Sequence, residues 1–223
     1  MTKVNCLPVY VLIDTSQSMS AFESMLNTGI ETLYDELVTS PRISDFAYVS
    51  IISFNTDAEV VMQMTDLQSM TALPQVKCGG STYFNAAIEL LRQRLDQDVP
   101  SLKSAGRQVL RPVAFLLTDG VPTDKTGRRA SDEWRPDYQA LVSQSYPNHP
   151  NVVPFGYGQA PPQFLTDVAT IPNTAFLATD NTKGALEKVI PALLNTLIAS
   201  AGHNDLSVPA EVDGFIRVAS DIL

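Results

Sequence analysis

Two apolar runs that each end in an aspartate place the strongest constraint on the fold. The first is 8-PVYVLI-13, followed by Asp14, and the second is 112-PVAFLLT-118, followed by Asp119. Near-continuous apolar runs of this length are typical of strands covered by helices on both faces of a parallel sheet. If the two strands are neighbours, the two carboxylates meet at one edge of the sheet, where ligands of α/β proteins bind.

Strand and helix patterns alternate along the chain. The segment 58–64 follows a tight turn and alternates imperfectly between apolar and polar residues, which favours an antiparallel edge strand. Pro191 should either kink the last helix or mark its start. The order predicts an α/β fold with an open, mostly parallel six-stranded sheet, one antiparallel edge strand and helices on both faces. The expected strands are 8–13, 46–54, 58–64, 112–119, 151–158 and 174–179, and the expected helices are 20–39, 83–96, 138–145 and 183–201.

Length and composition predict one large domain. The chain has 223 residues, of which 44% are hydrophobic, enough to support a core. We expect the domain to cover residues 1–201. The remaining segment, 202–223, is too apolar for a freely solvated end, so we expect it to dock on the domain or on a partner.

Charge and cysteine content narrow the functional classes. A formal net charge of −9 disfavours binding to nucleic acid or to an acidic membrane surface. No run is long enough to span a membrane, and we interpret the N-terminus as a core strand, not a signal peptide. Cys6 and Cys78 are too few for a disulfide scaffold or a zinc site, so a reducing cytoplasm is the expected compartment. The oligomeric state stays open, with a monomer favoured.

The residues around the two aspartates favour a hard divalent cation. Two carboxylates about 5 Å apart repel by roughly 3 kcal/mol at an effective dielectric constant of about 20. Hydroxyls, not cations, lie beside them in sequence, and a further hydroxyl-bearing loop, 79-GGSTYF-84, opens the second helix. Carboxylates and hydroxyls without thiol or imidazole suit Mg²⁺, with Mn²⁺ and Ca²⁺ as alternatives. Each aspartate alone could instead be a helix N-cap.

These residues resemble the metal-ion-dependent adhesion site of von Willebrand factor A domains. The matching pattern is Asp14-x-Ser16-x-Ser18, then Thr82 after Gly79-Gly80-Ser81, then Asp119 in 118-TDG-120. The resemblance covers about residues 6–200 and implies a three-layer, Rossmann-like fold. It also implies that Ser16, Ser18 and Thr82 are inner ligands, that Asp14 and Asp119 are supporting anions, and that a partner's carboxylate completes the coordination. Gln17 stands where relatives often have glycine.

Finer features are similar to the bacterial TerY-type proteins associated with tellurium resistance. They are Leu7-Pro8-Val9, 16-SQSM-19, 78-CGGST-82 and 117-LTDGVPTD-124. This similarity implies a cytoplasmic tellurite-resistance or stress-response system in which the partner is another protein. The expected function is therefore a metal-dependent protein-interaction module and not an enzyme.

The alternative is a metal-dependent hydrolase of phosphate esters. It shares the acidic pocket but predicts a basic or histidine group beside the ion, for which the sequence offers no obvious candidate. The sequence also lacks the usual phosphate-loop, dinucleotide-binding and serine-nucleophile motifs.

Overall fold

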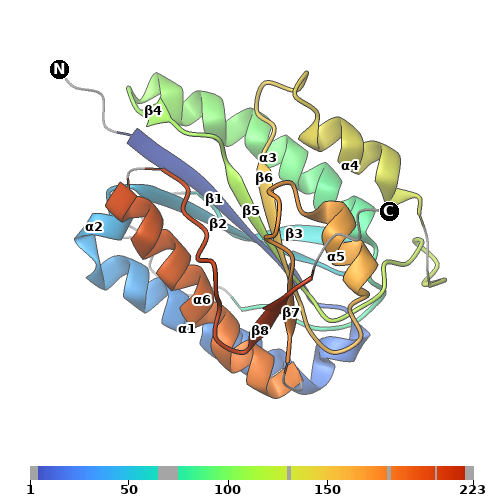
Figure 1. Ribbon diagram of the computed structural model, residues 1–223. Helices are drawn as coiled ribbons and strands as arrows, with labels where there is room; N and C mark the ends of the chain where they lie inside the picture. Colours follow the sequence, from blue (N-terminus) through green and yellow to red (C-terminus); the bar gives the residue numbers. More distant parts are fainter. Residues whose placement is uncertain (1–4, 65–74, 130–131, 180–181, 204, 219–223) are drawn as a thin grey trace.

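The strand β1 (Asn5–Asp14) lies in the interior of the sheet and organises the fold (Figure 1). It pairs in parallel with β2 (Ala47–Phe54) on one side and with β5 (Val113–Thr118) on the other. The computed structural model describes residues 5–64, 75–129, 132–179, 182–203 and 205–218. Nine of the ten β1 residues are buried, as expected for a strand covered on both faces.

The sheet of the described residues has the order β3-β2-β1-β5-β6-β7-β8, with the short β4 pairing with the beginning of β1. Strands β3 and β8 are antiparallel to their neighbours, and the other pairs are parallel. The remaining strands are β3 (Ala58–Met62), β4 (Gln108–Val109), β6 (Asn151–Gly156), β7 (Phe176–Ala178) and β8 (Phe215–Arg217).

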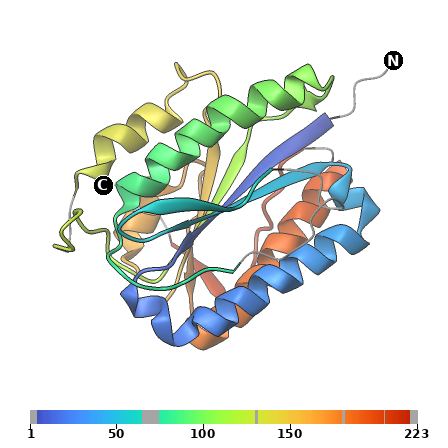
Figure 2. The same cartoon turned by 180° about the vertical axis from the view of Figure 1, so that it is seen from behind.

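Helices cover both faces of the sheet (Figures 1 and 2). One face packs against α1 (Glu23–Thr39), α2 (Pro41–Ser44) and α6 (Thr182–His203), and the other against α3 (Phe84–Ser104), α4 (Trp134–Val142) and α5 (Pro162–Val168). Side chains of β1 alternate between the two cores: Val11 and Ile13 face the first, and Tyr10 and Leu12 the second. No helix within the described ranges is long and apolar enough to cross a membrane.

The predicted fold class is confirmed, but the predicted number of strands is wrong. The described residues form eight strands with two antiparallel edge strands, where the sequence predicted six and one. The additional strands, β4 and β8, contain two and three residues, too few to produce a visible alternation of apolar and polar side chains. Pro191 lies inside α6, which begins at Thr182, so it does not mark the start of the helix.

The last strand, β8, comes from the segment beyond residue 201. It pairs antiparallel with β7 through Phe215, Ile216 and Arg217. The side chains of Val212 and Phe215 are buried in the core beneath α1 and α6. This part of the chain therefore adds a strand to the edge of the sheet.

The order of the strands has a topological switch point between β1 and β5. From β1 the chain proceeds outward to β2 and β3, and then returns across the sheet to β5 on the opposite side of β1. The loops that leave the carboxyl ends of β1 and β5 consequently diverge, and an open space forms above them. Asp14 and Asp119 are the residues at these two ends.

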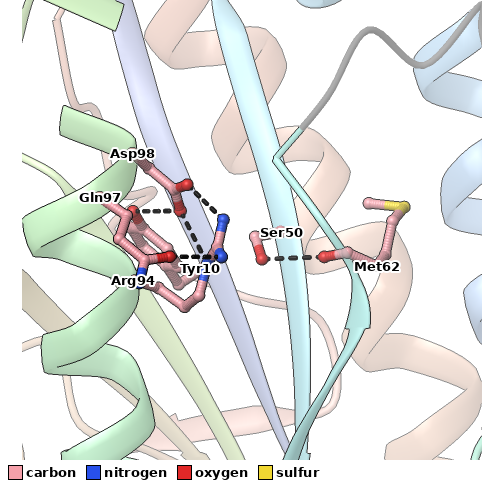
Figure 3. A network of polar contacts seen from close by, with 6 residues as sticks. All are labelled: Tyr10, Ser50, Met62, Arg94, Gln97 and Asp98. Carbon is pink, nitrogen blue, oxygen red and sulfur yellow. Dashed lines mark hydrogen bonds and ion pairs between the residues drawn. The ribbon is translucent and has the colours of Figure 1, made fainter. Parts of the chain in front are cut away.

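A buried polar network ties α3 to β1 at a distance from that edge (Figure 3). The Tyr10 hydroxyl donates to Asp98 Oδ2 at 3.1 Å, and the Arg94 guanidinium forms an ion pair with the same carboxylate. Tyr10 is completely buried, so its hydroxyl has no access to water as a substitute partner. Burial raises the pKa of Asp98, and the charge of Arg94 acts against this shift.

We expect Asp98→Ala to lower the free energy of unfolding by about 1–3 kcal/mol, because it leaves the buried Tyr10 hydroxyl without a partner. Gln97→Ala is the matched control, since Gln97 is exposed on the same helix and contacts Arg94 from outside. Urea unfolding of both variants measures the difference. Equal losses in the two variants would show that the Tyr10–Asp98 contact does not stabilise the fold.

Candidate metal centre

Asp14 lies at the bottom of the site, where β1 ends. Its carboxylate is fully buried and accepts two hydrogen bonds: from the Ser16 backbone N–H at 2.9 Å and from the Thr118 hydroxyl at 2.6 Å. The bond from Thr118 crosses directly from β5 to β1. The parallel pairing of the two strands therefore determines the position of this carboxylate.

A chain of hydrogen bonds extends from Asp14 toward solvent through Ser16, Ser18 and Asp119. The hydroxyl oxygens of Ser16 and Ser18 lie 3.1 Å apart, and the Ser18 hydroxyl donates to Asp119 Oδ1 at 2.9 Å. The 3-10 helix η1 (Gln17–Phe22) begins three residues after the end of β1 and carries Ser18 back toward the end of β5. Four of the five residues predicted from the sequence are thus joined by one chain of hydrogen bonds.

Thr82, the fifth predicted residue, reaches the same place from the 79–82 loop. This loop is attached to the end of β1 by the Gly79 N–H, which donates to the Thr15 carbonyl at 2.8 Å, and by the Gln17 N–H, which donates to the Gly80 carbonyl at 3.1 Å. A Cβ atom on Gly120 would lie 3.0 Å from Thr82 Oγ1 and 3.7 Å from Asp14 Oδ2. The two oxygens therefore flank a space that exists because residue 120 is glycine.

The site opens into a pocket of about 620 Å³. The residues that line it are mostly polar residues and glycines, and Phe22 and Val121 are the apolar side chains among them. The described residues contain no cluster of three or more histidine, cysteine, aspartate or glutamate side chains with metal-binding geometry. An ion held here would consequently depend on hydroxyl oxygens as well as on the two carboxylates.

The electrostatics of the site favour an added cation. Burial raises the pKa of Asp14 to about 6, although the hydrogen bonds from Thr118 and Ser16 lower it, and the charge of Asp119 raises it further. Burial likewise raises the pKa of Asp119, against the hydrogen bond from Ser18 and the charge of Arg129. Both carboxylates therefore lack compensation for their lost hydration, which a divalent cation would supply.

Two buried polar atoms without a hydrogen-bond partner in the described part of the chain lie around the site, and they fit a hydrated ion. Thr123 Oγ1 belongs to a residue that lines the pocket, and the Tyr157 hydroxyl belongs to a fully buried side chain next to the end of β6. Asp14 and Asp119 are close enough to Tyr157 for their charges to raise its pKa, after the larger effect of burial. Buried hydroxyls usually have partners, so water molecules bound to an ion are suitable partners for these two.

Sequence reasoning missed several residues of the site. Arg129 lines the pocket but lies ten residues after Asp119, in a polar loop without a periodic pattern. Tyr157 falls within the expected strand 151–158, where an aromatic side chain indicates a core residue. Trp134, the first residue of α4, is buried against Phe84 and Phe164 and packs in the core. Only the three-dimensional arrangement shows which of these residues lie at the site and which pack in the core.

Comparison with known proteins identifies the family to which this fold belongs. The von Willebrand factor type A domain family matches residues 9–192. No curated protein sequence is significantly similar to the chain.

Several solved structures share the fold. Proximal thread matrix protein 1 from the mussel byssus, solved with a zinc-occupied metal-ion-dependent adhesion site, is 18% identical over 88% of this chain and 48% of that protein, with a TM-score of 0.59. A von Willebrand factor type A protein from Catenulispora acidiphila is 16% identical over 87% of this chain and 43% of its own, with a TM-score of 0.59. The pilus adhesin SpaC from Lactobacillus rhamnosus GG is 15% identical over 89% and 31%, with a TM-score of 0.64.

The chain spans less than half the length of each of these three proteins, and identities this low establish the fold alone. The family match is more extensive, since it covers most of the chain and includes every residue of the site described above. The chain therefore belongs to the von Willebrand factor type A domain family.

Proposed function

We propose that the chain is a divalent-metal-dependent protein-interaction module. In this proposal Ser16, Ser18 and Thr82 hold the ion directly, and Asp14 and Asp119 support it through their negative charge. An acidic side chain of a partner protein occupies the open side of the ion. Domains of this family are typically metal-dependent interaction modules, and a matrix protein of the mussel byssus and a bacterial pilus adhesin share the fold.

One observation carries the proposal: oxygens from three separate loops converge on a space that Gly120 leaves free. The donors come from the ends of β1 and β5 and from the loop before α3, and a methyl group on Gly120 would contact two of them. A set of two carboxylates and three hydroxyls, without nitrogen or sulfur, suits Mg²⁺, and Mn²⁺ or Ca²⁺ can substitute. The ion would supply the positive charge that attracts the partner's carboxylate.

We further propose a bacterial, cytoplasmic setting related to tellurite resistance or another stress response. The support is the similarity of 16-SQSM-19, 78-CGGST-82 and 117-LTDGVPTD-124 to TerY-type proteins. Cys6 and Cys78 are both free thiols in the structure, which suits a reducing compartment. The partner would be another protein of the same system.

The alternative, a hydrolase of phosphate esters, gains one argument from the structure. Arg129 at the pocket is a basic group of the kind that this reaction needs near the ion and that the sequence did not identify. The described residues of the pocket include no histidine and no lysine to act as a general base beside Ser16, Ser18 or Thr82. We therefore favour binding over catalysis.

Metal binding should stabilise the protein. With saturating Mg²⁺ we expect the melting temperature to rise by several degrees, about 3–8 °C, because the ion binds only the native state. Thr82→Ala and Gly120→Ala should both abolish the rise, the first by removing an oxygen and the second by filling the space between Thr82 and Asp14.

Thr32→Ala is the control for this experiment, because Thr32 is exposed on α1 and bonds only within its own helix. Differential scanning fluorimetry with Mg²⁺, Mn²⁺ and Ca²⁺, each against a chelator, provides the measurement. A melting temperature that none of the three ions changes at millimolar concentration would refute the proposed function.

The chelated protein should become less stable as the pH rises from about 4 to 7. Because burial raises the pKa of Asp14 to about 6, the native state binds this proton more tightly than the unfolded chain does. The stabilisation is complete below the unfolded pKa of about 3.9 and is lost as the pH passes the native value, at a cost on the order of 3 kcal/mol.

Asp14→Asn should reduce this dependence and leave the part that comes from Asp119 and Asp98, whose pKa values burial also raises. Mg²⁺ should reduce it in the wild-type protein by binding the charged carboxylate. Urea unfolding in EDTA across this pH range measures the slope. A slope that is the same for the wild type and for Asp14→Asn would assign the pH dependence to other groups.

Turnover of phosphate esters distinguishes the two functions. We expect no hydrolysis of p-nitrophenyl phosphate above the buffer rate with Mg²⁺ or Mn²⁺. Hydrolysis that disappears in Asp14→Ala, at a protein concentration where the variant remains folded, would replace the binding function with the enzymatic one.

A further inference from the structure

Arg129 is the single lysine or arginine among the described residues that line the pocket. Most other lining side chains are uncharged, and Asp119 is the one carboxylate on the wall. The rest of the chain is strongly acidic, with a formal net charge of −9, which would repel an acidic partner. Arg129 therefore places a positive charge at the pocket that the proposed acidic ligand has to enter.

The loop that carries Arg129 is folded back onto the site. Thr123 and Arg129 form an antiparallel bridge, and the Thr123 N–H donates to the Thr82 carbonyl at 2.9 Å. The Asp124 carboxylate closes the intervening turn by accepting from the N–H groups of Thr126 and Arg128, both at 2.9 Å. The backbone at residue 129 is thus fixed relative to Thr82.

The Arg129 side chain is free to bind a ligand. It is exposed, and it forms no hydrogen bond or ion pair with any residue that the structure describes. Its charge nevertheless extends to Asp119, where it opposes the rise in pKa caused by burial. The guanidinium consequently lies near the carboxylate that supports the ion, without being neutralised by it.

A cation beside a metal site weakens metal binding unless an anion joins the two. A guanidinium presents paired N–H donors that match the two oxygens of a carboxylate, and it stays charged at all physiological pH values. An acidic side chain approaching the ion would meet this donor on the same side of the pocket. Neither the fold nor the metal requires a guanidinium here, so binding of the ligand is the role that this arrangement leaves for Arg129.

We infer that Arg129 makes the pocket selective for a carboxylate, by pairing with the same acidic side chain of the partner that reaches the ion. This inference rests on the proposed metal-dependent binding and adds to it a residue that determines specificity. It implies that Arg129 strengthens binding of the ligand and does not strengthen binding of the metal.

The test uses a capped peptide with a single central glutamate, its glutamine counterpart and inorganic phosphate as probes. Binding to the full chain with saturating Mg²⁺ is followed by NMR chemical-shift titration. Arg129→Ala should weaken binding of the glutamate peptide by about threefold to tenfold, the range for an exposed charged pair. Arg129→Lys should lose part of this affinity, because the ammonium lacks the paired donors.

Arg128→Ala is the matched control, since Arg128 is an exposed arginine on the same turn that does not line the pocket. It should change the affinity by less than about twofold, as expected for a surface charge that makes no contact with the ligand. The rise in melting temperature with Mg²⁺ should persist in Arg129→Ala, which separates this inference from the metal site itself. If Mg²⁺ does not raise the melting temperature of the wild type, the proposed metal-dependent function is refuted, whatever the role of Arg129.

Three results would overturn the inference while leaving the metal site intact. One is an equal loss of glutamate-peptide binding in Arg129→Ala and Arg128→Ala. Another is equal binding of the glutamate and glutamine peptides to the wild type. The third is tighter binding of phosphate than of the glutamate peptide, which would assign the pocket to phosphate groups.

Discussion

The hydrogen bond from the Thr118 hydroxyl to the Asp14 carboxylate, 2.6 Å long, is the contact on which the site depends. It exists because β1 and β5 pair in parallel at the point where the chain reverses its direction across the sheet. The same pairing brings Asp119 next to Ser18 and places Gly120 over Asp14. If the two strands were not neighbours, the carboxylates would be separate helix caps with no shared ligand.

The site buries two carboxylates with few compensating groups. Asp14 is fully buried and has a pKa raised to about 6, yet its neighbours are hydroxyls and a backbone amide instead of cations. A protein built only for stability would replace such a group by an apolar one or pair it with an arginine, as Asp98 is paired with Arg94 on α3. The contrast between the two buried aspartates supports the proposal that a cation compensates the charge of Asp14.

The loops around the pocket are held by backbone contacts, which leaves their side chains available. The loop before α3 is attached to the end of β1, and the loop after β5 is attached to Thr82. Hydroxyls at the ion site and a guanidinium at the rim therefore project from positions that do not depend on a ligand. Such preorganisation reduces the entropy that binding must overcome.

The sequence by itself determined the α/β class, the interior strands and the identity of all five oxygen-bearing residues. The class, the strands and the two aspartates follow from patterns of neighbouring residues: apolar runs, helical stripes, and aspartates placed directly at strand ends. Ser16, Ser18 and Thr82 were distinguished from the other hydroxyl residues by the resemblance to the family's metal-binding motif. The short strands β4 and β8, the burial of Trp134 and the positions of Arg129 and Tyr157 were decided only by the tertiary structure. The reason is that they depend on contacts between segments distant in the chain, as the 101-residue separation of Ser18 and Asp119 illustrates, and no local pattern encodes such contacts.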